Sequence, residues 1–444
     1  MVLHSSRTTL QITIQCIIAT FLIGCASSID ATKDVKSATM LATSRLPVLI
    51  DESLAWNPSE PLSVDAAISY AIMHDALLHR DMAIIVQRRA EIAQAELPAN
   101  PTFSGAFGVA IDGLAGAPII MQGMQGLSWL WTRPDRIAAS EQTLQQAILT
   151  AANRTVIIVA KVRTAHAEVS ANLLHAQAVE SSVSLSNKAI DITAELLAAG
   201  EASLDEIDEL TLALEKSKHL LLSKRKALQL SKLKLLEAMG CPDYIELVSI
   251  IPNDFGAQPA IFNERTLLEL AIKNRLDLAT KRAVVQQRSA ELGFANPLLF
   301  SGTIGFNENF VDRQAIMGGG SVTIALDGDA KDAIADSKLK QAELNYIDAL
   351  RTVQYEVRST LEQYLAVQEQ SEVIDAAIIT TTNRRLSRAN DTFHYGELHP
   401  ILLIPLQQEV LDANILAVED KLTLAITRFN LELAVGGTFR DITQ

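Results

Sequence analysis

Small and hydrophobic residues recur at alternating steps of four and three along residues 134–199. This spacing gives an α-helix one continuous apolar seam and is typical of helices that pack side by side as coiled coils. The pattern covers about 65 residues, or ~100 Å at 1.5 Å per residue. The seam positions are Leu144, Ile148, Ala151, Thr155, Ile158, Val162, Ala165, Val169, Asn172, Ala176, Val179, Val183, Ser186, Ile190, Thr193 and Leu197. We therefore expect one very long helix from about Pro134 to Ala199.

A second seam with the same spacing follows later in the chain. Its positions are Tyr346, Leu350, Val353, Val357, Thr360, Tyr364, Val367, Ser371, Ile374, Ile378 and Thr381. Many seam residues are Ala, Ser or Thr, which allow close approach of neighbouring helices. The sequence thus predicts long helices that lie side by side rather than one compact core.

Four glycine-rich segments instead alternate with period two, which is typical of β-strands. They are expected at about 102–112, 125–132, 298–309 and 317–326. One face of each carries large apolar residues, and the other carries Gly, Ala, Ser or Thr. Trp129 and Trp131 are expected near a strand end, where tryptophan suits a membrane–water interface. Length and alternation favour membrane-spanning strands over half-buried strands of a soluble sheet.

The elements occur twice in the same order. Asn100-Pro101 corresponds to Asn296-Pro297 and Gly200 to Gly396, both at an offset of 196 residues, whereas Ala90-Glu91 corresponds to Ala290-Glu291 at 200. The predicted segments are a signal peptide 1–24, an extended segment 25–63, a first repeat 64–240, a connector 241–263, a second repeat 264–437 and a C-terminal tail 438–444. The fold class is mostly α with membrane β, in two tandem repeats of long coiled helices plus two strand pairs.

The N-terminus carries a targeting pattern. Arg7 precedes an apolar stretch of roughly a dozen residues, which is too short for a permanent transmembrane helix. The stretch ends in Leu22-Ile23-Gly24-Cys25, which resembles a bacterial lipobox and would make Cys25 the lipidated first residue of the mature chain. Cys241 would then have no disulfide partner, and we interpret it as a small residue at a helix end.

Composition limits the classes of function. The 444 residues carry a formal charge of −14, which argues against binding to nucleic acid. His74 and His79 are five apart and do not share a helical face, so they do not form a metal pair of the zinc-protease kind. No phosphate loop or nucleophile elbow is present. We expect no enzyme, no metal and no cofactor other than the lipid on Cys25.

Together these features resemble the outer membrane efflux protein family, in its lipoprotein type. The resemblance rests on the lipobox, the duplicated order, the Asn-Pro pairs, "IKNRLDLA" at 272–279 and "LLAAGEASLDEIDEL" at 196–210. It implies a homotrimer in the outer membrane, with a twelve-stranded β-barrel continued by a periplasmic tunnel of twelve helices. It also implies a periplasmic adaptor and an inner-membrane pump as partners, and a duct for efflux or type I secretion. The substrate cannot be read from the residues.

The connection between the two long helices of the first repeat is rich in acidic residues. Gly200 is expected to end one helix, and Ser203 to cap the next in a Ser-x-x-Glu capping box. The acidic residues are Asp205, Glu206, Asp208 and Glu209. Capping explains the first two, whereas the resemblance places all four at a pore mouth. The corresponding helix–helix connection of the second repeat has Gly396 and His399 but lacks these acids. Pro405 is expected in the second turn of the helix that begins there, where it would kink that helix.

Two other functions fit parts of the sequence. A periplasmic adaptor lipoprotein would carry a lipobox and a coiled-coil hairpin, but only one hairpin between split β-domains. A structural coiled-coil lipoprotein without a pore would leave the alternating glycine-rich segments unexplained.

Overall fold

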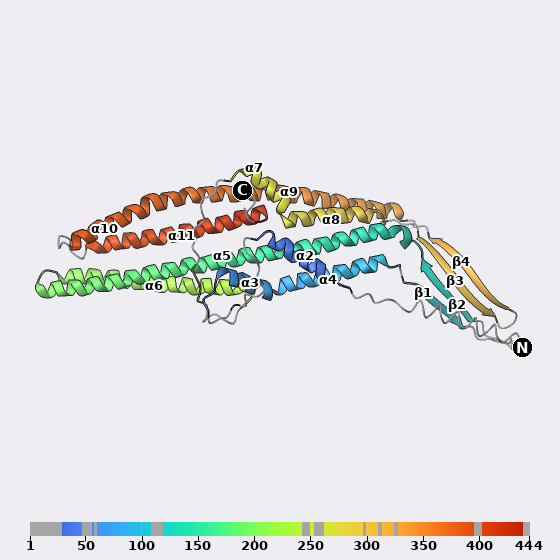
Figure 1. Cartoon of the computed structure of the whole chain (residues 1–444), viewed down its shortest axis with the longest axis horizontal. Coiled ribbons are helices and arrows are strands. Elements are labelled where there is room, and N and C mark those ends of the chain that lie inside the picture. The colour runs from blue at the N-terminus through green and yellow to red at the C-terminus, as the bar shows by residue number, and fades with distance from the viewer. Residues whose placement is uncertain are drawn as a thin grey trace.

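The protein is elongated, with a β-sheet at one end and the tips of long helices at the other (Figure 1). This computed structural model describes residues 29–46, 56, 60–98, 100–107, 119–241, 249–252, 262–295, 299–309, 313–323, 327–394 and 402–437. The signal peptide, Cys25, the C-terminal tail and most of the predicted connector lie outside these residues.

The described elements repeat in the predicted order. The first repeat contains α3 (Val64–His74), α4 (Ala76–Glu96), β1 (Thr102–Phe107), β2 (Ile119–Gly126), α5 (Trp129–Ala199) and α6 (Leu204–Met239). The second contains α7 (Glu264–Asn274), α8 (Leu276–Leu292), β3 (Leu299–Asn309), β4 (Arg313–Thr323), α9 (Gly328–Val373), the π-helical η1 (Ile374–Ile379), α10 (Thr380–His394) and α11 (Leu403–Val435). A further helix, α2 (Thr32–Thr43), precedes both repeats and packs on α4 and α5.

The four strands form one antiparallel sheet in the order β1-β2-β3-β4. Thr102 pairs with Met124, and Leu299 pairs with Thr323. Between these two hairpins, Ile119 of β2 pairs with Glu308 of β3, so the middle of the sheet joins the two repeats. Within the described part of the chain, β1 and β4 each have a strand neighbour on one side only.

The helices lie in a layer that keeps this order. Near the sheet, α5 packs between α4 and α8, and α8 also packs against α9. Towards the other end, α5 packs between α6 and α11, and α11 also packs against α9 (Figure 1). The salt bridge from Arg163 to Glu432, at 2.7 Å, fastens α5 to α11 and therefore one repeat to the other.

The predicted seam of the first long helix is confirmed. Its residues are buried except for Asn172, Val183, Ile190 and Leu197, which are half-buried. The largest cluster of buried side chains includes Ile158, Val162 and Val169 from this seam, together with Leu235 of α6 and Ile68 of α3. A coiled-coil spacing therefore identified both the helix and the face that packs.

The predicted strand at 125–132 is wrong. β2 ends at Gly126, and α5 begins at Trp129, five residues before Pro134. The Leu130 amide donates to Leu127 O and the Thr132 amide to Ser128 O, both of which are helical bonds. The same short segment also places Leu127, Leu130 and Trp131 on one face of a helix, so its alternation does not distinguish a strand from a helix.

The other strands are found within or close to their predicted limits. β1 covers residues 102–107 of the expected 102–112, and residues 108–112 lie outside the described part. β3 covers Leu299–Asn309 of the expected 298–309, and residue 298 is likewise not described. β4 begins at Arg313, four residues before the predicted start, and is described as far as Thr323, whereas residues 324–326 of the prediction lie outside the described part. The period-two alternation of large apolar residues is weak in Arg313–Met317, which explains why this extension was missed.

The second seam changes register within η1. Val353, Val357, Tyr364 and Ile374 are buried as predicted, whereas Thr381 is exposed and Thr382 is half-buried in its place. A π-helical turn contains one residue more than the corresponding α-helical turn. This extra residue moves every later seam position by one, so the predicted position of Thr381 is wrong.

Candidate functional site

The first-repeat turn joins α5 to α6 at the helical end of the molecule (Figure 1). Gly200 has φ 81° and ψ 15°, in the left-handed region that favours glycine. Its amide donates to Leu197 O at 3.0 Å, and the Glu201 amide donates to Leu196 O at 2.8 Å. This pair of bonds forms a Schellman motif, which satisfies the last carbonyl groups of α5. The predicted helix end at Gly200 is confirmed.

Ser203 begins α6 as predicted. Its extended backbone places Oγ to accept a hydrogen bond from the Glu206 amide at 3.3 Å. Asp205 and Glu206 lie in the first turn, where negative charge complements the helix dipole. These contacts account for the first two acidic residues as parts of a helix cap.

Asp208 and Glu209 lie one turn further along α6. Both side chains are exposed, as is that of Asp205, whereas Glu206 is half-buried. In the part of the chain that the structure describes, Asp205, Asp208 and Glu209 form no ion pair. The turn thus presents a solvent-facing group of negative charges at the end of a long helical hairpin.

The second-repeat helices end beside this turn. Gly396 and His399 lie outside the described residues, so their predicted roles stay predictions. The end of α10 and the start of α11 lie at the same end of the molecule as Gly200 (Figure 1). Pro405 is the third residue of α11 and lies in its first turn, where a proline replaces no intrahelical hydrogen bond. The predicted kink in the second turn is therefore wrong.

Basic residues on α10 complete the charge distribution of the helical end, and the sequence reasoning missed them. Arg385 pairs with Glu409 of α11, whereas Arg384 and Arg388 are exposed. The signal was available, because residues 376–390 contain three arginines and no acidic residue. The first-repeat tip is therefore acidic, whereas α10 of the second repeat carries three arginines and one aspartate, Asp391.

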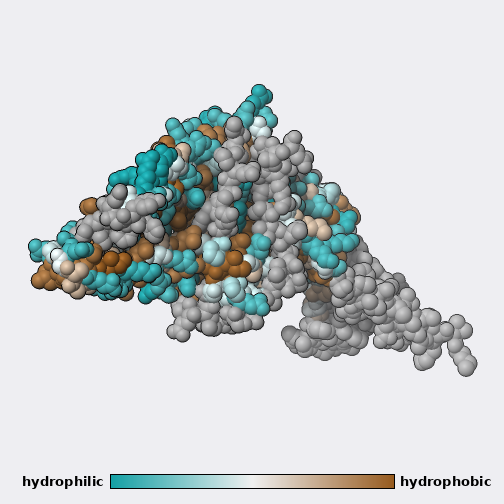
Figure 2. All heavy atoms as spheres, turned by 60° about the vertical axis from the view of Figure 1, so that its left-hand side comes forward, coloured by the Kyte–Doolittle hydropathy of each residue, from teal (hydrophilic) through white to brown (hydrophobic). Residues whose placement is uncertain are grey.

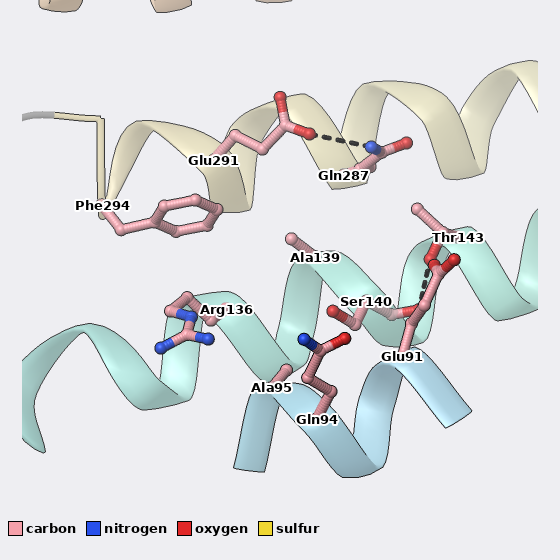
Figure 3. A pocket seen from close by; sticks show the side chains of 10 residues that line it. All are labelled: Glu91, Gln94, Ala95, Arg136, Ala139, Ser140, Thr143, Gln287, Glu291 and Phe294. Atoms are coloured by element: carbon pink, nitrogen blue, oxygen red, sulfur yellow. Dashed lines mark hydrogen bonds between the residues drawn. The ribbon is translucent and has the colours of Figure 1, made fainter. Parts of the chain in front are cut away.

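A cavity of about 260 Å³ lies near the other end of the helical layer (Figure 3). It opens between α4, α5 and α8, and the repeat-equivalent Glu91 and Glu291 both line it. Arg136, Ser140 and Thr143 of α5 also line it, and Phe294 lies at one side.

Both cavity glutamates are held by the same local contacts. Glu91 accepts from Gln87 at 2.9 Å and from Arg88 at 2.6 Å. Glu291 likewise accepts from Gln287 at 2.8 Å and from Arg288 at 2.6 Å. Burial opposes ionisation of Glu91, but these hydrogen bonds outweigh it and lower the pKa of its carboxyl group. Because each charge already has a partner, the two carboxylates act as structural contacts.

The "IKNRLDLA" segment forms a junction at the middle of the molecule. Arg275, between α7 and α8, binds Asp277 at 2.6 Å, contacts Glu356 of α9, and donates to Ala434 O of α11 at 3.3 Å. Burial opposes ionisation of Asp277, but the Arg275 guanidinium outweighs it and lowers the pKa of that carboxyl group.

A close backbone approach completes this junction. A Cβ atom on Gly436, whose φ is 81°, would lie 2.8 Å from the Arg275 backbone. Only glycine therefore fits the end of α11. The motif positions helices, which is a structural role.

The helix before the repeats is fixed to the first one. Asp34 of α2 accepts hydrogen bonds from Nη2 and Nε of Arg89 of α4, at 2.5 and 2.7 Å. Val35 and Ala38 pack near Ile92, close to the end of α4 that leads to the sheet. The N-terminal end of α2 is therefore directed towards the sheet.

Metal-binding clusters and membrane-spanning helices are both absent from the described ranges. No group of three or more His, Cys, Asp or Glu side chains is arranged to hold a metal ion. Cys241 is buried at the end of α6, in agreement with its interpretation as a packing residue. Among the helices that are described, none combines the length and apolar character needed to cross a membrane.

The chain shares this fold, a sheet that continues into a layer of very long helices with both repeats in one order, with solved outer membrane channels. The structure resembles the outer membrane protein VceC from Vibrio cholerae with a TM-score of 0.68 and 15% identity, over 85% of this chain and 97% of VceC. It resembles the CmeC outer membrane channel of Campylobacter jejuni with a TM-score of 0.65 and 15% identity, over 93% and 89% of the two chains.

A third solved structure, the MtrE outer membrane channel of Neisseria gonorrhoeae in its open state, gives a TM-score of 0.61 and 14% identity over 84% of this chain and 89% of MtrE. No protein-family model matches the sequence, and no curated protein matches it significantly. The resemblance predicted from the sequence is therefore confirmed at the level of the fold.

Proposed function

We propose that three copies of this chain form an outer-membrane duct through which solutes leave a periplasmic pump and adaptor. The observation that carries this proposal is the continuous side-by-side order of the sheet and the helical layer. A sheet with two open edges leaves backbone donors and acceptors unpaired, which a membrane does not tolerate. Pooling the four strands of each copy closes the edges, and three copies supply a barrel of twelve strands.

The helical layer would close in the same way. Each copy contributes two long hairpins, so three copies surround a tunnel with twelve helices. Two hairpins per chain favour this duct over the adaptor, which would need one, and the sheet favours it over a coiled-coil lipoprotein without a pore. The chain performs no chemistry in this proposal. Its partners, an adaptor and an inner-membrane pump of an efflux or type I secretion system, supply the energy.

The proposal includes a lipid on Cys25. Helix α2 is directed towards the sheet and fixed there by Asp34 and Arg89. Cys25 precedes Thr32 by seven residues, which reach up to ~25 Å when extended. That length allows the lipid to enter the inner leaflet near the barrel. One lipidated residue would add to the anchoring by the barrel without replacing it.

Membrane extraction tests the proposal. The mature protein is expected to stay in the membrane fraction after carbonate washing and to migrate as a trimer in an unheated detergent gel. The Cys25→Ser variant is expected to lose lipid labelling but to remain in the membrane, because the barrel is the main anchor. A mature protein that carbonate releases as a monomer would contradict the duct.

A further inference from the structure

In both the sheet and the helical layer, the two edges of the molecule belong to different repeats. The sheet runs from β1 to β4, and the helical layer runs from α4 or α6, through α5, to α9. One edge therefore comes from the first repeat and the other from the second. If copies assemble as in the proposed function, on which this inference rests, each contact joins two unlike edges. Such a head-to-tail contact closes a ring.

Both helical edges expose apolar side chains. On α6, Leu222, Leu230 and Leu233 are 66%, 51% and 41% exposed, and spacings of eight and eleven residues place them on one helical face. On α9, Tyr355, Leu365 and Val373 are exposed at spacings of ten and eight, again on one face. Figure 2 shows hydrophobic side chains at the surface along its lower left side, among hydrophilic ones.

Intramolecular contacts show which parts of these edges lie at the same level, meaning the same position along the long axis of the molecule. Lys224 of α6 pairs with Glu419 of α11 at 3.5 Å. Ten residues earlier in α11, Glu409 pairs with Arg385 of α10. Because α11 runs antiparallel to α9 and α10, counting ten residues back from Arg385 brings Asp375 to the level of Lys224.

The charges of the two edges are complementary at these levels. Residues 216–234 of α6 contain seven lysines and arginines and no acidic residue, whereas 362–375 of α9 and η1 contain four acidic residues and no basic one. Nearer the tip both signs reverse: 205–215 contains five acidic residues, and 376–390 contains three arginines. On both edges, therefore, the sign changes at about the same level.

Lys226 and Glu369 are central to this pattern. Both side chains are exposed and lie among the exposed apolar residues of their helices. In the described ranges neither forms an ion pair, although Arg225 beside Lys226 already binds Glu180 of the same copy. Their charges are thus available to another chain.

We propose that α6 of one copy packs antiparallel against α9 and α10 of the next copy, with Lys226 within about one helical turn of Glu369 along the contact, a distance that the two long side chains can span. Leu230 and Leu233 then cover Leu365, and the acidic tip of one copy meets the arginines of α10 in its neighbour. The partner for both edges is a second copy of this chain. The contact has a fixed register because a shift of two or three turns would bring like charges together.

Thiol cross-linking of the full-length protein in membranes tests this register. The double variant Lys226→Cys/Glu369→Cys is treated with a short bis-maleimide and analysed on a denaturing gel. We expect covalent trimers, because a head-to-tail contact links all three copies. The control is Lys161→Cys/Glu369→Cys, since Lys161 is exposed on α5 in the middle of the layer. The control and both single variants are expected to stay monomeric.

Other results would overturn the inference. Dimers from Lys226→Cys alone would show that like edges meet. An unlinked double variant that still runs as a trimer without heating would refute this register and leave the duct standing. A parent protein without any trimer would refute both.

Discussion

Asp208 and Glu209 are the acidic residues of the helical tip that helix capping does not explain. Ser203 and the first-turn acids satisfy and complement the start of α6, whereas these two side chains face solvent one turn later. In an assembled duct they would place six negative charges at the periplasmic mouth. Rings of carboxylates favour cations in channels.

Replacing both carboxylates by neutral amides, in the variant Asp208→Asn/Glu209→Gln, should therefore lower the selectivity for cations over anions by on the order of twofold. The reason is that the negative potential at the mouth becomes weaker when these charges are removed. The measurement is the reversal potential in a salt gradient across a planar bilayer. Glu237→Gln is the control, because it removes an exposed charge ~40 Å along the same helix. Unchanged selectivity, with the trimer intact, would assign all four acids to capping.

At the scale of elements, η1 is the main difference between the two repeats. The first long helix, α5, keeps one seam from Leu144 to Leu197, whereas the second changes register at Ile374–Ile379. A π-helical turn corresponds to one inserted residue in an α-helix. Its removal should leave Val353, Val357 and Thr382 on one seam of a regular α-helix.

Deleting Ala377, an exposed residue of η1, should therefore be tolerated, with the thermal midpoint of the trimer unchanged or raised. Deleting the exposed Ala366 of α9 should instead rotate nearby seam residues off the packed face and lower the midpoint by about 5 °C or more. Melting in detergent compares the two. Equal losses from both deletions would contradict the assignment of η1 as the inserted residue.

The sequence predicted the long helices well because each seam repeats over many turns. It also located Gly200 and Ser203, since a helix end and a helix start have specific residue requirements. It failed at residues 125–132, where strand and helix patterns coincide over a short span. It also failed at Thr381, because spacing alone does not reveal a π-helical turn. The cavity between Glu91 and Glu291 depends on three helices far apart in the chain and was not predicted.

At the scale of the whole molecule, one chain is an incomplete structure. Among the residues that the structure describes, the sheet has two open edges, and the helical layer exposes leucines and unpaired charges along its outer helices. Arg163 binds a partner in the other repeat and Arg275 one in its own, and both contacts hold the layer together. Because the elements keep the same side-by-side order from the sheet to the helical tip, a ring of copies would form one continuous wall.

The central claim is that this wall encloses a water-filled passage. Purified trimer added to a planar lipid bilayer in salt solution tests it most directly. The account predicts discrete, stepwise increases in ionic current, one for each inserted trimer. Heat-dissociated protein at the same concentration should give none. A correctly folded trimer that inserts into the bilayer and never conducts would contradict the duct.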